Sequence, residues 1–580
     1  MNQERDAFAG SMFRRLFAPA VISSVGLALS DMADAIVVGR RMGEVGLAAI
    51  GMSLPLYMAL NICMHGFGIG GSVRYAKLLG EGDREGAVLS FNRVLRASLA
   101  LSLLIALAIN LFPALFLRLM GTSAEDGALY GATLSYVRII ALGAPLFFLN
   151  YILNYYLRND DSAKAASLGF LAGNLTDIAL NILFVVILDY GTAGAACATL
   201  IGLAVSLLCY LPALLSKKHF LKICFRYIRP EWKNTFALFR SGFSTSSQYL
   251  WQMIFLLIAN HTLILHLGGV GVAVFDMVQN VSYLVMYLYD AASKALQPLA
   301  STFCGEKNRS AALHSRRIAL FCGLSVGLIA ILFISLFPES VCTIFGLAEP
   351  DARLLAIRAL RIYCLGASFA GVSVILESYY QSVDEERCAF AISLLRGCVT
   401  LIPATLLLGI FAPQAFWYVF PIAEILSFVF FLGWKKVFYV PAQKSDLSRV
   451  FSRAIRSRTD DLGALTEDIS DFCDRFGASA RQKYFVTMAA EEISLAIIDG
   501  GFVGRKDGVI QLTLIALENG EFELHIRDNA TSFDPFSLHT DKVGRDDFDM
   551  DAMGILVIKK RAKNFFYRRY QGFNSLVVRI

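Results

Sequence analysis

The chain has 580 residues, of which 56% are hydrophobic and only 17% are charged, and its mean hydropathy is +0.56. This composition excludes an ordinary soluble protein of the same length and predicts residence in a membrane. The net charge of +6 is modest and the basic residues lie mostly in loops, so nucleic acid is not an indicated partner. The eleven cysteines contain no C-x-x-C pair, which favours reduced core residues over a zinc or redox site.

Twelve apolar stretches of the length that a spanning helix needs lie within the first 440 residues. Their centres fall near residues 26, 58, 102, 143, 175, 203, 252, 284, 326, 366, 397 and 423. The second loop is basic, with Arg74, Lys77, Arg84, Arg93 and Arg96, and so is the sixth, with Lys217, Lys218, Lys222, Arg226, Arg229 and Lys233. The fifth, seventh and eleventh loops have no Lys or Arg. The positive-inside rule therefore predicts a multi-pass protein of the bacterial inner (plasma) membrane with both termini in the cytoplasm.

An internal repeat divides the membrane part into two halves of six helices. The segment LGEGDREGA (79–87) recurs as CGEKNRSAA (304–312), an offset of 225 residues. Tyr156 and the following NDDSAK correspond to Tyr380 and QSVDEE at an offset of 224. Because six is even, the halves 1–220 and 221–440 share one orientation, and a binding site is expected between them near the bilayer midplane. This arrangement is typical of transporters.

Three segments carry a resemblance to a known family. They are DMADAIVVGRRMGEVGLAAIG (31–51), LGEGDREGA after the second span, and GTAGAACAT (191–199), which opens the sixth span. In this order and spacing they resemble the MATE (multidrug and toxic compound extrusion) family of efflux transporters, over about residues 10–437. The resemblance implies a non-enzymatic antiporter that exports small, cationic, apolar xenobiotics by alternating access, with H⁺ or Na⁺ as coupling ion and no required cofactor.

The candidate ion-coupling residues lie in the first and fifth spans. Asp34 matches the family's first-helix acid, for which the resemblance implies proton or sodium binding; a solvated or capping acid is the alternative. In the fifth span the family carries Asn and then Asp, whereas this chain has the inverse order, Asp177 then Asn181, with Asn174 one turn earlier. The three share one helix face and suit cation coordination, or alternatively hydrogen bonding between helices.

A polar stripe in the second half predicts a substrate cavity. Intramembrane polar residues at helical spacing do not face lipid cheaply. The residues expected to line the cavity are Gln248, Gln252, Asn260, Asp276, Gln279, Asn280 and Tyr283. Helix packing is the alternative for each of them. Glu377 and Glu424 are expected nearer the cytoplasmic ends of their helices and solvated.

The composition changes after Lys436, and residues 441–580 are predicted to form a cytosolic domain. Its pattern reads as helices at 461–475 and 480–500, strands at 509–517 and 521–528, a helix at 552–563 and a final strand pair at 565–580. The fold class of the whole chain is therefore an all-α polytopic membrane protein of twelve transmembrane helices with a C-terminal α+β sandwich domain.

This domain resembles the GHKL ATP-binding domain of histidine kinases, on AAEEISLAI (489–497), RDNATSFDP (527–535) and MGILVIKK (553–560). The resemblance implies that Glu492, Asp528 and Gly554 belong to a nucleotide site, with Asp528 on the adenine and Gly554 near phosphate. The family's magnesium-binding Asn is Ala496 here, and a glycine of the second box is Ala530. The preferred interpretation is a degenerate, inactive domain that is kept for interaction or regulation. A cytosolic regulatory protein is the candidate partner, and ATP binding is left open.

Two other functions stay in view beside secondary active multidrug efflux. A flippase for a lipid-linked precursor is expected to line its cavity with basic residues, whereas the intramembrane charge of this chain reads as mainly acidic. A membrane sensor signalling through the C-terminal domain has the fused domain as its support. An ATP-driven pump is disfavoured because the chain contains no Walker P-loop.

Overall fold

The structure is a computed structural model, which describes most of the chain. The described residues are 7–119, 127–216, 220–224, 232–345, 350–438, 447–457, 460–502, 508–536 and 551–580. Between residues 31 and 48 the backbone is described as helical, but most side chains, those of Asp31 and Asp34 among them, fall outside the described part.

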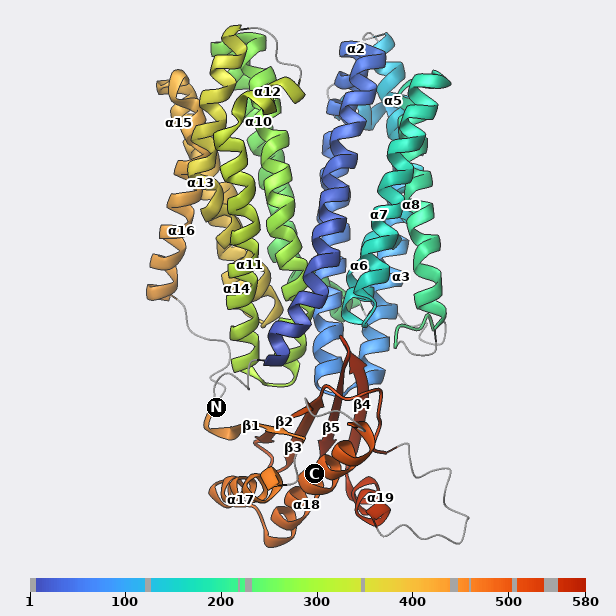
Figure 1. Cartoon of the computed structure of the whole chain (residues 1–580). Helices are drawn as coiled ribbons and strands as arrows, with labels where there is room; N and C mark the ends of the chain where they lie inside the picture. The colour runs from blue at the N-terminus through green and yellow to red at the C-terminus, as the bar shows by residue number, and fades with distance from the viewer. Residues whose placement is uncertain are drawn as a thin grey trace.

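Residues 7–438 form a bundle of long helices that run side by side (Figure 1). The N-half comprises α2 (Ala7–Gly80), α3 (Arg84–Leu111), α4 (Pro113–Leu119), α5 (Ala128–Leu142), α6 (Ala144–Asn159), α7 (Ala163–Asn181), η2 (Ile182–Ile187) and α8 (Gly191–Leu215). The C-half comprises α9 (Trp232–Ser246), α10 (Gln248–Gly305), α11 (Arg309–Leu336), α12 (Pro338–Ile344), α13 (Pro350–Ser382), α14 (Glu386–Leu394), η3 (Leu395–Leu401), α15 (Ile402–Phe411), η4 (Pro413–Tyr418) and α16 (Val419–Phe438).

The bundle contains the predicted number of membrane spans. Eleven helical segments of the described chain are long and apolar enough to cross a membrane. The pair α5 and α6 forms a twelfth span that bends by 51°. The bend falls at Gly143, where Pro145 follows at the start of α6 and cannot donate a backbone hydrogen bond. The prediction of a twelve-helix polytopic bundle is thus confirmed.

Two helices contain two spans each. α2 holds the spans Phe8–Ser30 and Ala49–Gly80, and α10 holds Gln248–Leu267 and Val270–Gly305. A straight helix of 74 residues would be about 110 Å long, far more than a bilayer. Both ends of α2 nevertheless contact the same C-terminal hairpin, through Phe8 and the loop glycine Gly82. The chain therefore reverses direction between the two spans of α2.

The repeated segments build the same local structure in each half. Asp83 caps the N-terminus of α3 and accepts a 2.8 Å hydrogen bond from the Gly86 backbone N–H. Asn308, at the equivalent place before α11, accepts one of 3.1 Å from Ala311 N–H. Both are short polar residues that satisfy an otherwise unpaired backbone donor. The sequence repeat is therefore a helix-capping loop, used twice.

The two halves meet closely at the end of the bundle formed by these loops, which we call the proximal end. A Cβ added at Gly80 would lie 2.5 Å from the Thr302 carbonyl oxygen, and one at Gly305 would lie 2.3 Å from that of Lys77. Lys77, which sequence reasoning placed in an exposed basic loop, lies inside the second span, is 7% exposed and pairs with Asp384 of the C-half. In Figure 1 the ribbons of the halves diverge toward the opposite, distal end.

The C-terminal domain is a five-stranded antiparallel sheet with helices on one face. Its strand order is β1-β2-β3-β5-β4. The elements are β1 (Val450–Arg456), α17 (Asp460–Arg475), α18 (Ala480–Ala496), η6 (Ile497–Gly501), β2 (Val509–Ala516), β3 (Phe522–Asp528), α19 (Asp551–Arg561), β4 (Asn564–Tyr570) and β5 (Phe573–Arg579), with the short turn η5 (Leu447–Arg449) before β1. The predicted elements are all present, whereas the edge strand β1 was missed by the sequence.

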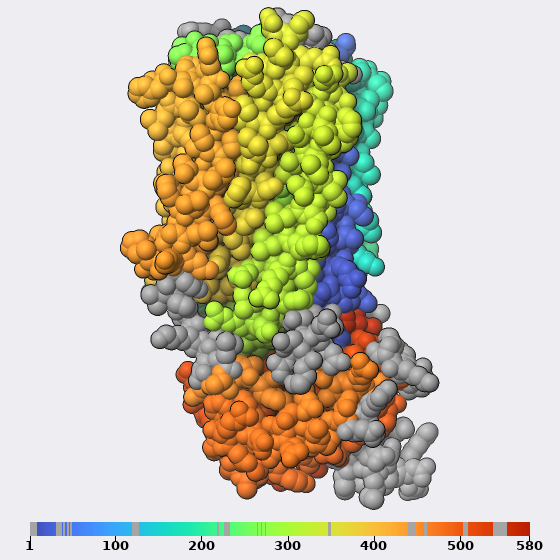
Figure 2. Space-filling view, turned by 60° about the vertical axis from the view of Figure 1, so that its left-hand side comes forward, coloured from blue at the N-terminus to red at the C-terminus, as the bar shows by residue number. Residues whose placement is uncertain are grey.

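The domain lies against the proximal end of the bundle (Figures 1 and 2), and the β4–β5 hairpin points into the bundle (Figure 1). In β3 the alternate residues Leu524 and Ile526 join the hydrophobic core under the helices, whereas Glu523, His525 and Arg527 point to the other face. These three polar side chains are only 3–6% exposed. The polar face of the sheet is therefore covered, as expected for an interface.

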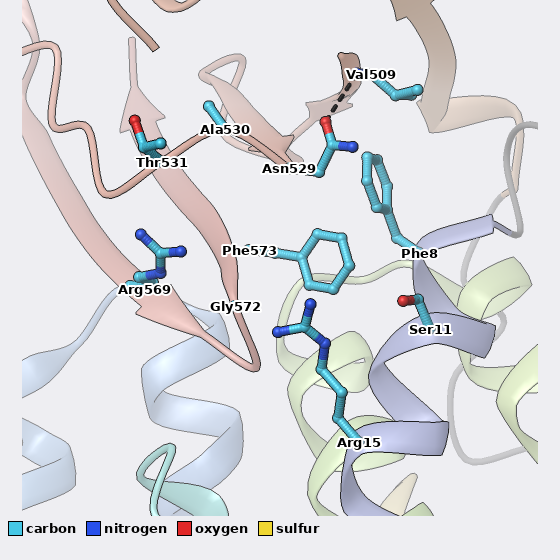
Figure 3. Close-up of a pocket in the computed structure, with 10 residues that line it drawn as sticks. All are labelled: Phe8, Ser11, Arg15, Val509, Asn529, Ala530, Thr531, Arg569, Gly572 and Phe573. Atoms are coloured by element: carbon cyan, nitrogen blue, oxygen red, sulfur yellow. Dashed lines mark hydrogen bonds between the residues drawn. The ribbon is translucent and has the colours of Figure 1, made fainter. Parts of the chain in front are cut away.

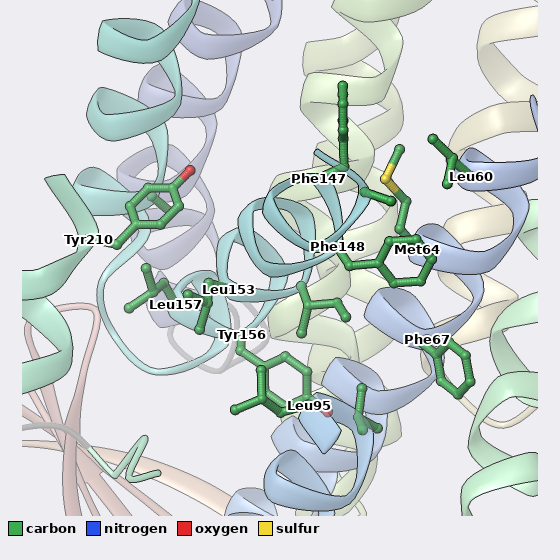
Figure 4. Close-up of a cluster of buried hydrophobic side chains, with 14 of the residues drawn as sticks. Leu60, Met64, Phe67, Leu95, Phe147, Phe148, Leu153, Tyr156, Leu157 and Tyr210 are labelled. Carbon is green, nitrogen blue, oxygen red and sulfur yellow. The ribbon is translucent and has the colours of Figure 1, made fainter. Parts of the chain in front are cut away.

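Four hydrophobic clusters hold the molecule together. One fills the N-half (Figure 4), one the C-half toward its distal end, one the proximal end and one the C-terminal domain. The hairpin belongs to two of them. Phe566 and Val577 are part of the N-half cluster, while Tyr570 and Phe573 are part of the proximal cluster, which consists mostly of C-half residues such as Leu296. The hairpin thus contributes to the packing of both halves.

Candidate functional site

A buried carboxylate joins the first and fifth spans. Asp177, on α7, is 7% exposed and accepts a 3.1 Å hydrogen bond from the Ser30 hydroxyl of α2. Its other oxygen accepts a 3.1 Å bond from the Asn181 side-chain amide. The amide oxygen of Asn181 and the carboxylate are ligands of the kind that sodium prefers, and a buried carboxylate is also a proton acceptor. The Asp177–Asn181 pair predicted from sequence is therefore in contact.

The other two coupling candidates lie beside this pair. Asn174 is half-buried one turn before Asp177, and its Nδ2 has no hydrogen-bond partner within the described part of the chain. It faces Gly26 of α2, since a Cβ at Gly26 would lie 4.0 Å from that nitrogen. Asp34 follows Ser30 by one helical turn, but its side chain is outside the described residues. The coupling role of all four residues stays a prediction.

Glycines bring α7 and α8 together behind this site. A Cβ at Gly202 would lie 2.7 Å from the Gly173 carbonyl oxygen and 3.0 Å from the Cβ of Asp177. Real Cβ atoms do not approach that closely, so both positions require glycine for backbone contact. This packing fixes the face of α7 that carries Asp177 toward α2.

An aromatic cluster between the halves was not predicted. The His65 ring of α2 stacks on Tyr249 of α10, with centroids 4.9 Å apart and planes 16° apart. Its Nδ1 lies 2.9 Å from the Tyr155 hydroxyl of α6, and Tyr151 meets the ring edge-on at 5.2 Å. The cluster joins both halves in the middle of the bundle. A lone histidine in an apolar span was its only sequence signal.

Two basic residues of other helices contact the first span of α2. Arg158 of α6 is 2% exposed and donates to Asn154 at 3.0 Å and to the Ser23 hydroxyl at 3.3 Å. Lys294 of α10 pairs with Asp290 at 2.6 Å and lies 3.5 Å from the Ser24 hydroxyl. These two basic side chains were not among the residues singled out from the sequence, which was taken to carry mainly acidic charge inside the membrane.

The predicted cavity residues of α10 are only partly brought together. Gln252 donates a 2.8 Å hydrogen bond to the Tyr283 hydroxyl, which joins the two arms of α10. Gln279 is 9% exposed, while Gln248 and Asn280 are half-buried. Asn260 and Asp276 are exposed. Gln252 and Tyr283 are therefore in contact and Gln279 is the most buried of the seven; we call these three the inward stripe of α10.

The C-half carries a buried charge pair that corrects one expectation. Glu377 and Glu424 were expected to be solvated, but Glu377 is 2% exposed and the Glu424 side chain is 17% exposed. Arg396 donates to both carboxylate oxygens of Glu424, at 2.8 and 2.9 Å. Glu377 does lie near the end of α13 at Ser382, yet it is buried, because the expectation took no account of packing between helices. Glu377 Oε1 has no hydrogen-bond partner among the described residues.

In the C-terminal domain, two of the three nucleotide-site candidates are in contact. A Cβ at Gly554 of α19 would lie 2.2 Å from Glu492 Oε2 of α18, so the Glu492 side chain packs against this glycine and would have to move for a larger residue. Asp528, at the end of β3, is 2% exposed, and one of its oxygens accepts from Ala530 N–H at 2.9 Å and from Asn574 at 2.7 Å. Burial raises the pKa of Asp528 to about 6, against the opposing effect of these hydrogen bonds. Nucleotide binding by this set stays untested.

A cavity of about 380 Å³ lies where the domain meets α2 (Figure 3). Phe8 and Arg15 of α2 both approach Phe573, the former ring at 5.0 Å and the latter guanidinium at 5.5 Å. The lining residues are Phe8, Ser11, Arg15, Val509, Asn529, Ala530, Thr531, Arg569, Gly572 and Phe573. A second cavity of about 230 Å³ shares Arg15 and Gly572. Both cavities are at the seam between domain and bundle.

The sequence is similar to curated multidrug transporters. It is 23% identical over 351 residues to "Probable multidrug resistance protein YoeA" of Bacillus subtilis, covering 59% of this chain and 75% of that protein. It is 22% identical over 420 residues to "Multidrug export protein MepA" of Staphylococcus saprophyticus, covering 70% and 89%.

The fold is similar to solved MATE structures. "Crystal structure of MATE in complex with MaD3S" matches with a TM-score of 0.68 at 23% identity, over 74% of this chain and 95% of that one. "Outward-facing conformation of a multidrug resistance MATE family transporter of the MOP superfamily" matches with a TM-score of 0.67 at 24% identity, over the same shares.

Two family models account for the chain. The model described as Histidine kinase-like ATPase domain matches residues 455–580, which confirms the resemblance seen in the C-terminal motifs. The model described as MatE matches residues 19–183 and 241–407, which is more than half of the chain. The protein is therefore a multi-pass membrane protein that belongs to the MatE family and carries a C-terminal histidine kinase-like ATPase domain.

Proposed function

We propose that the protein is a secondary active exporter of xenobiotics, in which entry of H⁺ or Na⁺ drives small-molecule efflux as the two halves alternate access. The proposal agrees with the multidrug-resistance and multidrug-export names of its relatives. The division into 1–220, 221–440 and 441–580 is part of it, and is supported by the separate hydrophobic clusters of the two halves and the domain.

The observation that carries this proposal is the buried Asp177. A carboxylate held in low dielectric between helices binds a proton or cation far more readily than a solvated one. Its hydrogen bond to Ser30 ties it to α2, one turn from Asp34. Loading or unloading of this site would change the α2–α7 contact, and α2 also contacts the C-half through the Ser24 and Lys294 side chains. A coupling ion thus has a physical path to the relative position of the halves.

The substrate region is assigned to the aromatic cluster and the inward stripe of α10. His65, Tyr155 and Tyr249 offer ring faces and hydroxyls between the halves, which favours flat, apolar cations through stacking and cation–π contact. Gln252, Gln279 and Tyr283 would supply hydrogen bonds from the C-half. No catalytic chemistry is assigned to the chain, and the kinase-like domain is proposed to be inactive because Ala496 offers no ligand for magnesium.

The membrane orientation is proposed from charge. Exposed basic side chains such as Arg84 and Arg309 stand at the proximal end beside the C-terminal domain. The positive-inside rule then assigns the proximal end and the domain to the cytoplasm of a bacterial inner membrane. Protease accessibility of the domain in everted versus right-side-out vesicles tests this orientation, since only everted vesicles should expose it.

The decisive test is dye efflux under separate collapse of the proton and sodium gradients. Cells or vesicles carrying the protein should lose efflux when the coupling gradient is removed and keep it when the other is removed. Asp34→Asn and Asp177→Asn should each abolish gradient-driven efflux while the protein stays inserted. Efflux that ignores both gradients would contradict the proposal.

A lipid-linked precursor is the second candidate substrate, and the buried Arg158 favours it. This guanidinium is bonded to Asn154 and Ser23, both neutral, so it could accept a phosphate group. Lys294 and Arg396 already have carboxylate partners. Arg158→Gln separates the candidates, because a flippase should lose activity and an exporter of cations should keep or gain it.

A further inference from the structure

The β4–β5 hairpin makes direct contacts with the N-half. A Cβ at Gly82, in the first repeated loop, would lie 3.3 Å from the Cβ of Phe566 and 3.8 Å from that of Val577. The Phe566 ring lies 5.4 Å from that of Phe220. At the hairpin turn, the Gln571 backbone N–H donates a 2.5 Å hydrogen bond to Asp161. One side of the hairpin is therefore fixed to the loops of the N-half.

The same sheet contacts the C-half through the second repeated loop. Glu306 is 4% exposed and accepts a 2.5 Å hydrogen bond from Arg527 of β3, while Arg568 of β4 lies 3.9 Å away. The Arg527 guanidinium also covers the Phe303 ring at 5.0 Å. Glu306 is the repeat equivalent of Glu81, which is exposed. The two copies of the loop thus have different partners.

The hairpin is too short and stiff to stretch between moving halves. Its two-residue turn has positive φ angles at Gln571 (53°) and Gly572 (81°), as in a type I′ turn. Separation of the halves at the proximal end would pull Gly82 away from Glu306. Because β3 is paired with β5, the hairpin and β3 move as one sheet, which could then keep only one of the two contacts.

Of the contacts with the N-half and with Glu306, the contact with Glu306 is the weaker, because its positive and negative charges do not balance. One carboxylate faces two guanidiniums that are each at most 6% exposed. Arg568 Nη1 and Nη2 and Arg527 Nε have no hydrogen-bond partner within the described chain. Burial of an unpaired charge is costly, so both guanidiniums gain hydration when the contact opens.

We propose that the β4–β5 hairpin, together with the adjacent strand β3, is a reversible latch across the proximal end of the transporter, and that the Arg527–Glu306 contact must break each time that end opens. The C-terminal domain therefore acts on the chain's own two repeated loops and restrains the turnover of the transporter. This inference rests on the alternation of the halves proposed above.

The test measures opening of the proximal end without requiring transport. Spin labels on unnatural amino acids at Glu85 and Ser310, both exposed at the equivalent first turns of α3 and α11, avoid the eleven native cysteines. Glu306→Gln should increase the long-distance population at least about tenfold, because both guanidiniums lose their counter-ion. The matched control Glu81→Gln, at the exposed repeat position, should leave the distances unchanged.

Two further variants separate the latch from simple misfolding. Arg568→Met removes, at similar volume, the second guanidinium, which lies 3.9 Å from Glu306 and makes no hydrogen bond among the described residues through Nη1 or Nη2. It should therefore shift the population the other way, toward the closed proximal end, and slow efflux. The exchange Glu306→Arg with Arg527→Glu should restore the wild-type distribution that Glu306→Gln disturbs. An unchanged distance in Glu306→Gln, or an opening caused by Arg568→Met, would overturn the proposal.

The outcomes also distinguish the latch from the proposed function. If wild-type distances never respond to substrate or gradient, alternation of the halves fails first. If they respond but Glu306→Gln matches wild type, the halves alternate and the latch alone is wrong.

Discussion

Asp177 is the residue whose surroundings make the sharpest functional prediction. Asp177→Asn keeps the shape of the side chain and its contacts with Ser30 and Asn181, but removes the charge. Gradient-driven efflux should fall at least about tenfold, because the site can no longer exchange a proton or cation. Initial rates in proteoliposomes measure this loss.

Two further variants decide how a loss of efflux in Asp177→Asn is interpreted. Asp189→Asn removes an aspartate whose side chain is 64% exposed and pairs with Arg41. It should leave efflux unchanged. Adding Asn181→Asp to Asp177→Asn restores the family's order of the two residues. Recovery of efflux would mean that the pair acts as one site, whereas continued inactivity would mean that the position of the charge matters.

Asp528 predicts a pH dependence of the C-terminal domain. Burial raises its pKa to about 6, whereas an aspartate in an unfolded chain has a pKa of about 3.9. The folded state holds the proton longer, so the free energy of unfolding should fall as the pH rises from about 4 to about 6. About two pKa units limit this loss to about 3 kcal/mol.

Hydrogen exchange of the β3 and β5 amides in the full chain, corrected for intrinsic rates, measures this effect. Asp528→Asn should lack the loss between pH 4 and 6 and so be the more stable protein, relative to wild type, at pH 7. Asp474→Asn, which breaks an exposed pair with Lys483, serves as control and should change stability by at most about 1 kcal/mol at either pH. Parallel pH curves for Asp528→Asn and wild type would contradict the prediction.

At this scale the sequence predicted some partners and not others. Asp177 and Asn181 are four residues apart on one helix, and local helix geometry is enough to bring them together. The bond from Asp177 to Ser30 spans 147 residues, and no local rule predicts it. His65 and Arg158 were missed for the same reason, since each has partners on other helices.

At the scale of elements, the glycine contact of α7 with α8 is the tightest that supports the candidate site. Gly202→Ala would place a Cβ 2.7 Å from the Gly173 backbone oxygen, which cannot move aside as a flexible side chain could. The helices must separate, at a cost of about 1–3 kcal/mol. We expect a lower thermal midpoint in detergent and weakened efflux.

Gly131→Ala is the matched control on α5, because nothing lies within 4 Å of the added Cβ. Alanine is also the better helix former, so this variant should be neutral or slightly stabilising. Equal midpoints for the two variants would show that the close approach of α7 and α8 is not required.

The elements themselves were largely predictable, and the exceptions have physical causes. Long apolar runs and the repeated capping loops define the spans without knowledge of packing. The strand β1 was missed because it is an edge strand with basic residues such as Arg453 and Arg456 and only one well-buried apolar residue, Ile455. Its pairing with β2 is a tertiary contact that period-two patterning does not encode.

At the scale of the whole molecule, closure at the proximal end predicts opposite movements at the two ends. The Glu85–Ser310 distance spans the proximal end, and a distance between the exposed Asp189 and Glu339 side chains spans the distal end. When substrate is added without a gradient, we expect the first distribution to lengthen and the second to shorten. Pulsed electron spin resonance measures both; movement of the two distances in the same direction would exclude alternation by rocking.

The division into two halves could be predicted because the repeated segments recur in the sequence at a nearly constant offset. The position of the C-terminal domain against the bundle was not predictable from the sequence. It depends on pairs such as Arg527 and Glu306, which lie 221 residues apart. The alternation of Glu523, His525 and Arg527 along β3 indicated that one face of the sheet is polar, but not that this face is buried. In a free-standing domain the same alternation would simply mean a solvated face.

The contact of Phe8 with Phe573 has a consequence for the biosynthesis of the protein. These two rings are 565 positions apart in the chain yet 5.0 Å apart in space. At ribosomal rates of about 5–20 residues per second, Phe8 waits on the order of half a minute to two minutes for its partner. During that interval the membrane helices have been inserted while their proximal surface is still uncovered. A truncated product that ends before the hairpin would keep that apolar surface permanently exposed, which marks it for recognition by chaperones and proteases.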